Sequence, residues 1–475
     1  MIRPRRRPGA IGGAAILAAI VALLAPTLGR GATIRVPATP GALADAVARA
    51  ADGDSLLLAS GVHRGGAVID RRLALRGEPG AVVDGERSGS VLRIMAAGTS
   101  VRDLTVRGSG PSPLTIDAGI YVQDAKNVRV EGLRFEDVLY GIAAERSDSL
   151  RIEDSELRGR ATPTTGVRRG HEASEGNGVH LWYCRDVVVR RTRVTRFVDG
   201  IYLSFTFRAL IEENLLWENA RYGLHTMYNQ ENRLRRNRFT ENVAGCALMF
   251  SNHLVLDGND FVRNRGPRTY GLLLRDCSDG VFTQNRLAEN TIALFMDGSN
   301  RNRIEENLIQ DNGWGVLLFS SCDDNEFARN NFWNNDYPVA LDMRRSNNRF
   351  DDGATGNYWS ENAPYDLDGN GISDVPFSPV SAFAFLSKQF PDLAIFGKSP
   401  AVTALTMAER TIPALRPSDV VDRFPLVRPE PAAPSASAGR PPSAPAGRHR
   451  AAAVAGFGLV AMIGLAGFAG AFRAR

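Results

Sequence analysis

The chain has 475 residues with a formal net charge of +5 at neutral pH, and 44% of its residues are hydrophobic. Its basic residues are mixed with acids and form no basic run with interleaved aromatics, so we expect no nucleic-acid partner. Cys184, Cys277 and Cys322 fall at the same small turn position of a repeat described below, two or more repeats apart, and Cys246 should point into the core of that repeat. We therefore expect no disulfide framework, although an exported chain could form one.

Residues 1–32 have the features of a secretory signal peptide, because four arginines within the first seven residues precede an apolar run over residues 9–25. An uncleaved N-terminal anchor is the alternative. Residues 33–66 are expected to form an N-terminal cap, with a strand, an amphipathic helix over residues 43–50 and a second strand. This pattern resembles the cap of pectate-lyase-like β-helices, which covers the open end of a repeat array.

Residues 67–350 contain a repeat of 22 or 23 residues that is clearest between Gly178 and Leu318. Each copy opens with a glycine and a short apolar strand of the pattern G-I-x-L. Most copies have an N-x-[FL] element fourteen residues after the glycine and a second asparagine five residues later. The glycines are Gly178, Gly200, Gly223, Gly245 and Gly271, and the asparagine pairs are Asn214/Asn219, Asn237/Asn242, Asn259/Asn264 and Asn285/Asn290.

Strands this short, separated by Asn, Asp and Gly, cannot bury an apolar face within one copy, so the copies must stack. We predict an all-β fold, a right-handed parallel β-helix. The asparagines are expected at its corners, where they tolerate left-handed backbone and can hydrogen-bond to the next copy.

The alternation along G-I-x-L predicts which side chains face outward. The first and third residues after the glycine should point into the core, and the second and fourth should point to solvent. The outward residues with long side chains are His180, Trp182, Tyr202, His225, Met227 and Met249. Thioether sulfur favours Cu(I) and imidazole suits copper in either state, so the candidate copper ligands are His180, His225, Met227 and Met249. The alternative is that these residues pack beneath a loop or against a docked partner.

The period breaks between Arg160 and Ser174, which predicts a long loop that contains His171 and Glu172. Loops that project from a rigid scaffold often carry function. Residues 351–400 should form a C-terminal cap with an apolar docking segment, whose aromatic and aliphatic residues are Phe383, Phe385, Leu386 and Phe390.

Within this cap, four side chains have the 1-3-5-9 spacing of a calcium-binding loop: Asp366, Asp368, Asn370 and Asp374. Gly371 stands at position six, but the twelfth position is Phe377 rather than Glu. A cluster of Asx turns that closes the cap without calcium is the alternative.

Residues 401–450 are rich in Pro, Ala, Ser and Arg and are expected to form a linker. Residues 451–472 carry no charge over 22 positions, which is long enough for a transmembrane helix. A sorting tail that is removed after export is the alternative.

A secreted polysaccharide-modifying enzyme (a lyase, hydrolase or epimerase) is the competing function for a parallel β-helix. Such reactions need carboxylates held together, or a basic residue beside a calcium-bound uronate. The chain lacks the N-x-D…D-D…G-H-G set of polygalacturonases and the D-P-H-D motif of alginate epimerases. We therefore expect no catalytic site.

Several segments together resemble the NosD family: G-V-H-L-W-Y-C, D-G-I-Y-L-S-F-T, Y-G-L-H-T-M-Y, the N-x-F repeats, and N-Y-W-S followed by Y-D-L-D-G-N-G-I-S-D-V-P-F. The resemblance covers about residues 33–395. It implies a CASH-domain β-helix that acts in the periplasm as an accessory protein for maturation of the copper centres of nitrous oxide reductase. The implied partners are an ABC-type ATPase and its permease, nitrous oxide reductase and a copper chaperone lipoprotein. On this reading the chain has no catalytic site. From the residues themselves we expect transient contact with copper at the four candidate ligands, and an anchor to the inner membrane at residues 451–472, which is not a feature expected of every family member.

Overall fold

The computed structural model describes residues 31–160, 176–267, 269–389, 393, 396, 399–412 and 417–431. The apolar part of the expected signal peptide, the expected loop after Arg160, Phe390 and the expected span 451–472 lie outside the described residues. Within the described ranges, no helix has the length and apolar character needed to cross a membrane.

The described strands form three sheets whose neighbouring members pair in parallel, and each turn of the chain, here called a rung, contributes one strand to each sheet. Sheet 1 has 13 strands: β1 (Thr33–Val36), β2 (Ser55–Leu58), β5 (Ala74–Gly77), β8 (Ser100–Arg102), β11 (Arg129–Glu131), β14 (Arg151–Glu153), β17 (Val188–Arg190), β20 (Leu210–Glu212), β23 (Arg233–Arg235), β26 (Val255–Asp257), β29 (Val281–Thr283), β32 (Arg303–Glu305) and β35 (Glu326–Ala328).

Sheet 2 has 12 strands within the described residues: β4 (Ala67–Ile69), β7 (Leu92–Ile94), β10 (Ala118–Gln123), β13 (Tyr140–Glu145), β16 (Val179–Trp182), β19 (Asp199–Ser204), β22 (Tyr222–Met227), β25 (Ala244–Met249), β28 (Tyr270–Arg275), β31 (Ile292–Asp297), β34 (Trp314–Leu318) and β37 (Tyr337–Leu341). Sheet 3 has 13 strands in the same ranges: β3 (Gly61–Arg64), β6 (Ala81–Asp84), β9 (Thr105–Arg107), β12 (Arg134–Glu136), β15 (Glu156–Arg158), β18 (Arg193–Thr195), β21 (Leu215–Trp217), β24 (Arg238–Thr240), β27 (Asp260–Val262), β30 (Arg286–Ala288), β33 (Leu308–Gln310), β36 (Asn331–Trp333) and β38 (Tyr358–Trp359).

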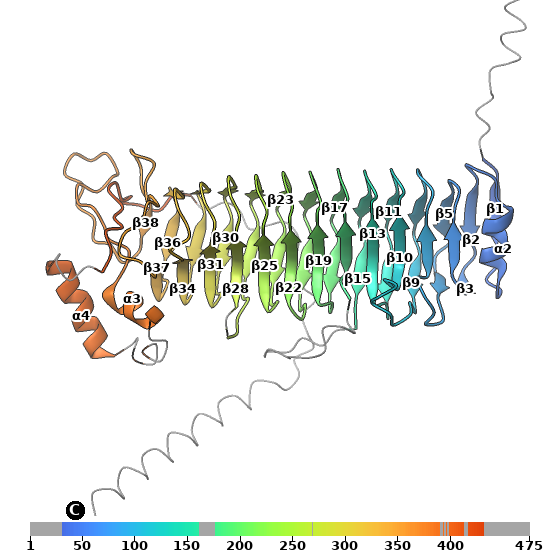
Figure 1. Ribbon diagram of the computed structural model, residues 1–475, viewed down its shortest axis with the longest axis horizontal. Coiled ribbons are helices and arrows are strands. Elements are labelled where there is room, and N and C mark those ends of the chain that lie inside the picture. The colour runs from blue at the N-terminus through green and yellow to red at the C-terminus, as the bar shows by residue number, and fades with distance from the viewer. Residues whose placement is uncertain are drawn as a thin grey trace, which may run out of the picture. The chain divides into compact units, whose positions relative to one another are not determined.

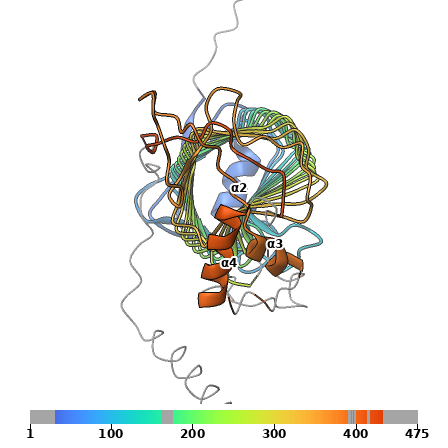
Figure 2. The same cartoon turned by 90° about the vertical axis from the view of Figure 1, so that its left-hand side faces the viewer.

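These sheets confirm the predicted parallel β-helix. Viewed along the stack, they form the walls of a tube (Figure 2). The tube is filled by the inward side chains of each strand, so that Val179 and Leu181 of β16 lie under Ile201 and Leu203 of β19, all fully buried. Cys246 is also in this core. The four cysteines are buried free thiols.

Asparagine ladders connect the rungs at their corners. Asn237 illustrates the pattern: its Nδ2 donates to Oδ1 of Asn259 (3.0 Å) and to the carbonyl of Ile211 (2.7 Å), and its backbone N–H donates to the same Oδ1 (3.0 Å). The two longest ladders contain Asn214, Asn237, Asn259, Asn285, Asn307, Asn330 and Asn357, and Asn219, Asn242, Asn264, Asn290, Asn312 and Asn335.

The expectation of left-handed backbone at these asparagines is wrong. The residue with positive φ is the one before each of these asparagines except Asn357, such as Glu213 (φ 56°) and Arg236 (φ 49°). The asparagine itself points inside the corner, because only there can its amide reach the carbonyls of the preceding rung.

A short helix closes the N-terminal end of the stack. Helix α2 (Ala42–Arg49) buries Leu43, Ala46 and Val47 against the first rungs, which confirms the predicted cap helix. Helices α3 (Ala382–Gln389) and α4 (Pro400–Thr411) lie at the other end (Figure 1).

The C-terminal cap extends beyond residue 400, into the stretch expected to be a linker. Ser399 accepts a hydrogen bond from the backbone of Val402 and starts α4, and Glu409 of α4 accepts one from the first residue of α3 (3.0 Å). Farther on, Asp422 is fully buried and accepts hydrogen bonds from the Trp359 indole (2.8 Å) and the Asn357 backbone (2.7 Å). Burial raises the pKa of Asp422 to about 6 despite these bonds.

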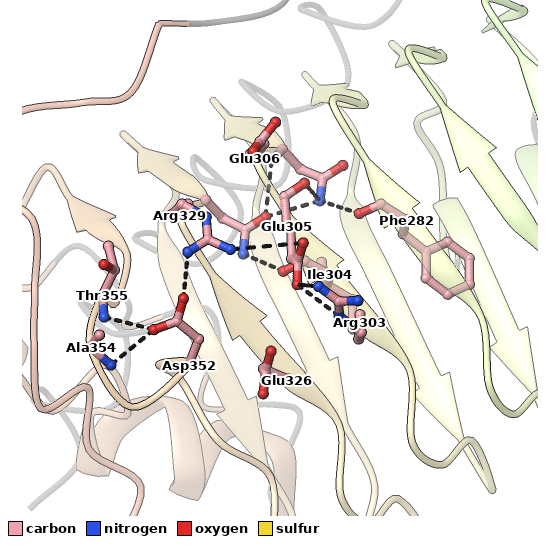
Figure 3. A network of polar contacts seen from close by, with 12 residues as sticks. Phe282, Arg303, Ile304, Glu305, Glu306, Glu326, Arg329, Asp352, Ala354 and Thr355 are labelled. Carbon is pink, nitrogen blue, oxygen red and sulfur yellow. Dashed lines mark hydrogen bonds and ion pairs between the residues drawn. The ribbon is translucent and has the colours of Figure 1, made fainter.

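Ion pairs connect the last rungs to this cap (Figure 3). Glu305 accepts two hydrogen bonds from Arg303 (2.9 and 2.6 Å) and lies 3.9 Å from Arg329. Arg329 also pairs with Asp352, whose other oxygen accepts bonds from the backbone of Ala354 (2.9 Å) and Thr355 (2.7 Å). The network therefore joins β32 to the loop that follows the last full rung.

Replacing one ladder asparagine tests this architecture. Asn259→Ala removes the acceptor for the Asn237 backbone and the donor for the Leu234 carbonyl, which are both buried. Each unsatisfied buried group costs about 1–3 kcal/mol, so we expect the free energy of unfolding in urea to fall by about 2–4 kcal/mol. The exposed Asn347→Ala is the control and should change it by less than about 0.5 kcal/mol. Equal effects of the two variants would contradict the ladder's role.

Candidate metal-binding surface

The six outward residues with long side chains lie together on the outer face of sheet 2. Across rungs, His180 pairs with Tyr202 and Tyr202 with His225, while Met227 pairs with Met249. We call this set the His/Met strip: His180, Trp182, Tyr202, His225, Met227 and Met249.

The Tyr202 ring separates the two histidines of the strip. Its centroid lies 5.0 Å from the His180 ring and 5.0 Å from the His225 ring. Two rungs separate the histidine backbones by about 9.6 Å, so the two imidazoles cannot both bind one ion in this arrangement. By contrast, Met227 and Met249 occupy adjacent rungs, and Met227 follows His225 by two residues on the same face.

His225 is held from one side by a buried carboxylate. Its Nδ1 lies 3.1 Å from Oδ2 of Asp199, a fully buried carboxylate that also accepts hydrogen bonds of 2.9 and 2.6 Å from Arg221. Burial alone would raise the pKa of Asp199, but the hydrogen bonds from Arg221 and His225 and the positive charge of Arg221 outweigh it and lower that pKa. The Nε2 atom of His225 is buried and has no hydrogen-bond partner.

His180 is held differently. Nδ2 of Asn177 donates to its Nδ1 (3.0 Å), and Oδ1 of Asn177 accepts from the backbone N–H of Asp199 (3.2 Å). Burial lowers the pKa of His180 to about 4, so this imidazole is neutral at pH 7. The Tyr140 ring meets it edge-on, with the centroids 5.4 Å apart.

The two thioethers are half-buried on the same face. The hydroxyl of Tyr202 donates to Sδ of Met227 at 3.6 Å. Met249 packs against an outer apolar cluster that continues along sheet 2 and contains Ala247, Leu273, Ile292 and Phe295, with Tyr222, Tyr270, Trp314, Leu317 and Phe319 at its edges. The strip is thus continuous with a longer apolar face toward the C-terminus.

The donor set of the strip fits a soft cation. No three His, Cys, Asp or Glu side chains in the described ranges gather in a way that could hold a metal. The strip would instead supply thioether sulfur from Met227 and Met249 and the unpartnered Nε2 of His225, and such donors prefer Cu(I). The carboxylate on the other ring nitrogen of His225 matches the support that metal-binding histidines usually have.

The loop with calcium-like spacing is closed by its own hydrogen bonds. Asp366 accepts from the backbone of Gly369 (2.8 Å), Asn370 (3.0 Å) and Gly371 (3.0 Å), and Asp374 accepts from Leu367 (2.7 Å). Asp368 accepts from the Asn370 side chain (2.9 Å). This arrangement corresponds to the Asx-turn alternative, and calcium binding by Asp366, Asp368, Asn370 and Asp374 stays a prediction.

A row of stacked aromatic rings next to the strip was missed by the sequence analysis. Tyr183, Phe205, Tyr228 and Phe250, which we call the aromatic ridge, each follow the last residue of a sheet 2 strand. Their rings stack at 4.7, 5.0 and 5.0 Å. The signal was present in the sequence, because the fifth residue after the glycine is aromatic in four successive copies.

The ridge residues have a backbone conformation that is unusual for aromatic residues. Their φ values lie between 48° and 58°, and the other described non-glycine residues with positive φ are polar or charged, apart from Ile116. This conformation costs roughly 1–2 kcal/mol per residue. Tyr183, Tyr228 and Phe250 are also 47%, 44% and 38% exposed. Backbone strain and side-chain exposure together indicate that these rings form a functional surface rather than part of the packed core.

In the C-terminal cap, the expected docking segment is partly used for packing. Phe383 is buried, and its ring lies 6.0 Å from that of Tyr337. Leu386 on α3 and Met407 on α4 are 38% and 64% exposed. An apolar surface therefore remains at this end of the stack.

Comparison with known proteins gives consistent results. The family model described as periplasmic copper-binding protein (NosD) matches residues 161–364. Two relatives carry the name probable ABC transporter binding protein NosD. The one from Pseudomonas aeruginosa is 31% identical over 395 residues, which is 80% of this chain and 89% of the relative. The one from Stutzerimonas stutzeri is 27% identical over 387 residues, covering 78% and 86%.

Among solved structures, the Dettilon tailspike protein (gp208) has a TM-score of 0.53 at 15% identity, over 65% of this chain and 66% of that one, and shows the fold alone. The family assignment rests on the sequence relatives, which are named as ABC transporter binding proteins, and on the matching family model, which is described as a periplasmic copper-binding protein. This chain belongs to the NosD family.

Proposed function

We propose that this chain is a periplasmic accessory protein for maturation of the copper centres of nitrous oxide reductase. It acts beside an ABC-type ATPase and permease and contacts copper as a transient cargo at the His/Met strip. A copper chaperone lipoprotein supplies the metal, and residues 451–472 hold the chain at the inner membrane.

The observation that carries this proposal is the donor set of the strip. One buried imidazole nitrogen without a partner and two half-buried thioethers lie on adjacent rungs of the same face. Soft donors of this kind favour Cu(I) over the divalent ions that carboxylates select. A stack of paired rungs also keeps these donors in one register, since each side chain is fixed by the strand beneath it.

Two exposed apolar surfaces support a role with several partners. The aromatic ridge spans the same four rungs as the strip. On the rungs before and after it, the equivalent positions hold charged residues, Arg146 and Asp276. Aromatic residues inside a polar rim are typical of protein interfaces. The surface on α3 and α4 lies at the C-terminal end of the stack, and it is the surface that we assign to the permease.

The copper assignment is tested with the double variant Met227→Ala/Met249→Ala. Removing both thioethers should weaken Cu(I) binding at least about tenfold, measured by competition with a chromogenic Cu(I) chelator. Met95→Ala is the matched control, because Met95 is 48% exposed and lies outside the strip. Equal Cu(I) affinities for wild type and the double variant would remove the strip from the proposal.

The partner assignment is tested with two surface variants that should fail differently. Leu386→Asp/Met407→Asp places charges on α3 and α4 and should abolish co-purification of the ATPase and permease from membranes. Phe205→Asn/Tyr228→Asn removes two ridge rings, and asparagine suits their backbone, so folding should be retained. It should keep the transporter and weaken binding of the copper chaperone roughly tenfold or more. Loss of both partners, or of neither, by both variants would contradict this assignment.

A further inference from the structure

We propose that Asp199 and Asn177 are positioning residues that fix opposite tautomers of the two strip histidines, so that His225 is a ligand of the cation and His180 is a hydrogen-bond donor. This inference rests on the proposed function and specifies which residue binds the cation and which residues position it.

The tautomer of His225 follows from its partner. An ionised carboxylate can only accept hydrogen bonds, so the contact between Nδ1 of His225 and Oδ2 of Asp199 (3.1 Å) requires the proton on Nδ1. In the neutral form of this imidazole, Nε2 then carries a lone pair. This is the nitrogen that is buried and without a partner, on a side chain that is only 8% exposed. A buried lone pair of this kind is what a metal ligand presents before the metal arrives.

The tautomer of His180 follows from the orientation of Asn177. Oδ1 of Asn177 already accepts the backbone N–H of Asp199 (3.2 Å), so its amide nitrogen must face His180. Nδ2 is a donor, and Nδ1 of His180 is therefore the acceptor. The proton of this neutral imidazole is on Nε2, which leaves no lone pair for a metal.

The same hydrogen bonds define the charge of the site. Arg221 makes two hydrogen bonds to Asp199 (2.9 and 2.6 Å) and balances its negative charge. His225, Met227 and Met249 are neutral donors, so the site offers no net negative charge to a divalent ion. The class of ligand is a monovalent soft cation, for which Cu(I) is the cargo and Ag(I) is an air-stable probe.

The experiment uses the full-length protein labelled with ¹⁵N in its histidines, of which the chain has six. Nitrogen chemical shifts distinguish a protonated ring nitrogen from an unprotonated one. We expect the proton on Nδ1 in His225 and on Nε2 in His180. Addition of Ag(I) should shift Nε2 of His225 and leave both nitrogens of His180 unchanged, and Zn(II) should shift neither residue.

Asp199→Asn tests the positioning role. It removes the fixed acceptor of the Nδ1 proton, so we expect His225 to lose its single tautomer and Cu(I) affinity to fall about 10–100-fold. Asp260→Asn is the matched control, because Asp260 is also a buried outward carboxylate paired with an arginine, Arg238 at 2.9 Å, but lies on sheet 3. It should leave the histidine shifts and Cu(I) affinity unchanged, and thermal unfolding of both variants shows the cost of losing a buried ion pair.

The possible results separate the two proposals. Identical tautomers in His180 and His225, an Ag(I) shift at His180, or unchanged shifts and affinity in Asp199→Asn would overturn this inference while Cu(I) binding by wild type stood. Absence of Cu(I) and Ag(I) binding by wild type, with the two tautomers as expected, would instead remove the metal-binding role itself.

Discussion

The constraint on which the rest of this structure depends is the register between successive rungs. Parallel strands repeat about every 4.8 Å, and each corner asparagine bonds to the asparagine of the next rung and to a carbonyl of the previous one. A shift of one residue would break these buried bonds and turn every core side chain outward. Because the register cannot shift, equivalent outward side chains form straight columns. The His/Met strip contains two such columns, and the aromatic ridge is a third.

The column arrangement was predictable because it depends on period alone. Val179 and Leu181 are apolar and alternate with His180 and Trp182, so the inward and outward faces follow from the pattern. The ladder asparagines were also predictable as rung-to-rung contacts. Their backbone was not, because the left-handed position falls on the preceding residue, such as Glu213, whose type does not indicate positive φ.

The chemistry of the candidate site was only partly predictable. The sequence places His180 and His225 in equivalent positions and treats them alike. In the structure their difference comes from residues at other positions of the rungs, because Asp199 reaches His225 from the rung before it and Asn177 reaches His180 from three residues earlier on its own rung. The C-terminal cap was not predicted for the same reason. Asp422 contacts Trp359, which lies 63 positions earlier in the chain, whereas composition alone indicated a linker in that stretch.

A rigid stack imposes one further consequence on a protein that handles a cation. Neither the rungs nor their columns can move toward a ligand, so selectivity must come from hydrogen bonds already made before the ligand arrives. Asp199, Arg221 and Asn177 make such bonds within three successive rungs, and they set the proton position and the charge around His225 without any change in backbone. The aromatic ridge lies along the same rungs at the ends of the same strands, so a protein docked on its exposed rings would also lie beside Met227 and Met249. Recognition of a partner and contact with its cation can thus share one face, because the register that aligns one column aligns the other.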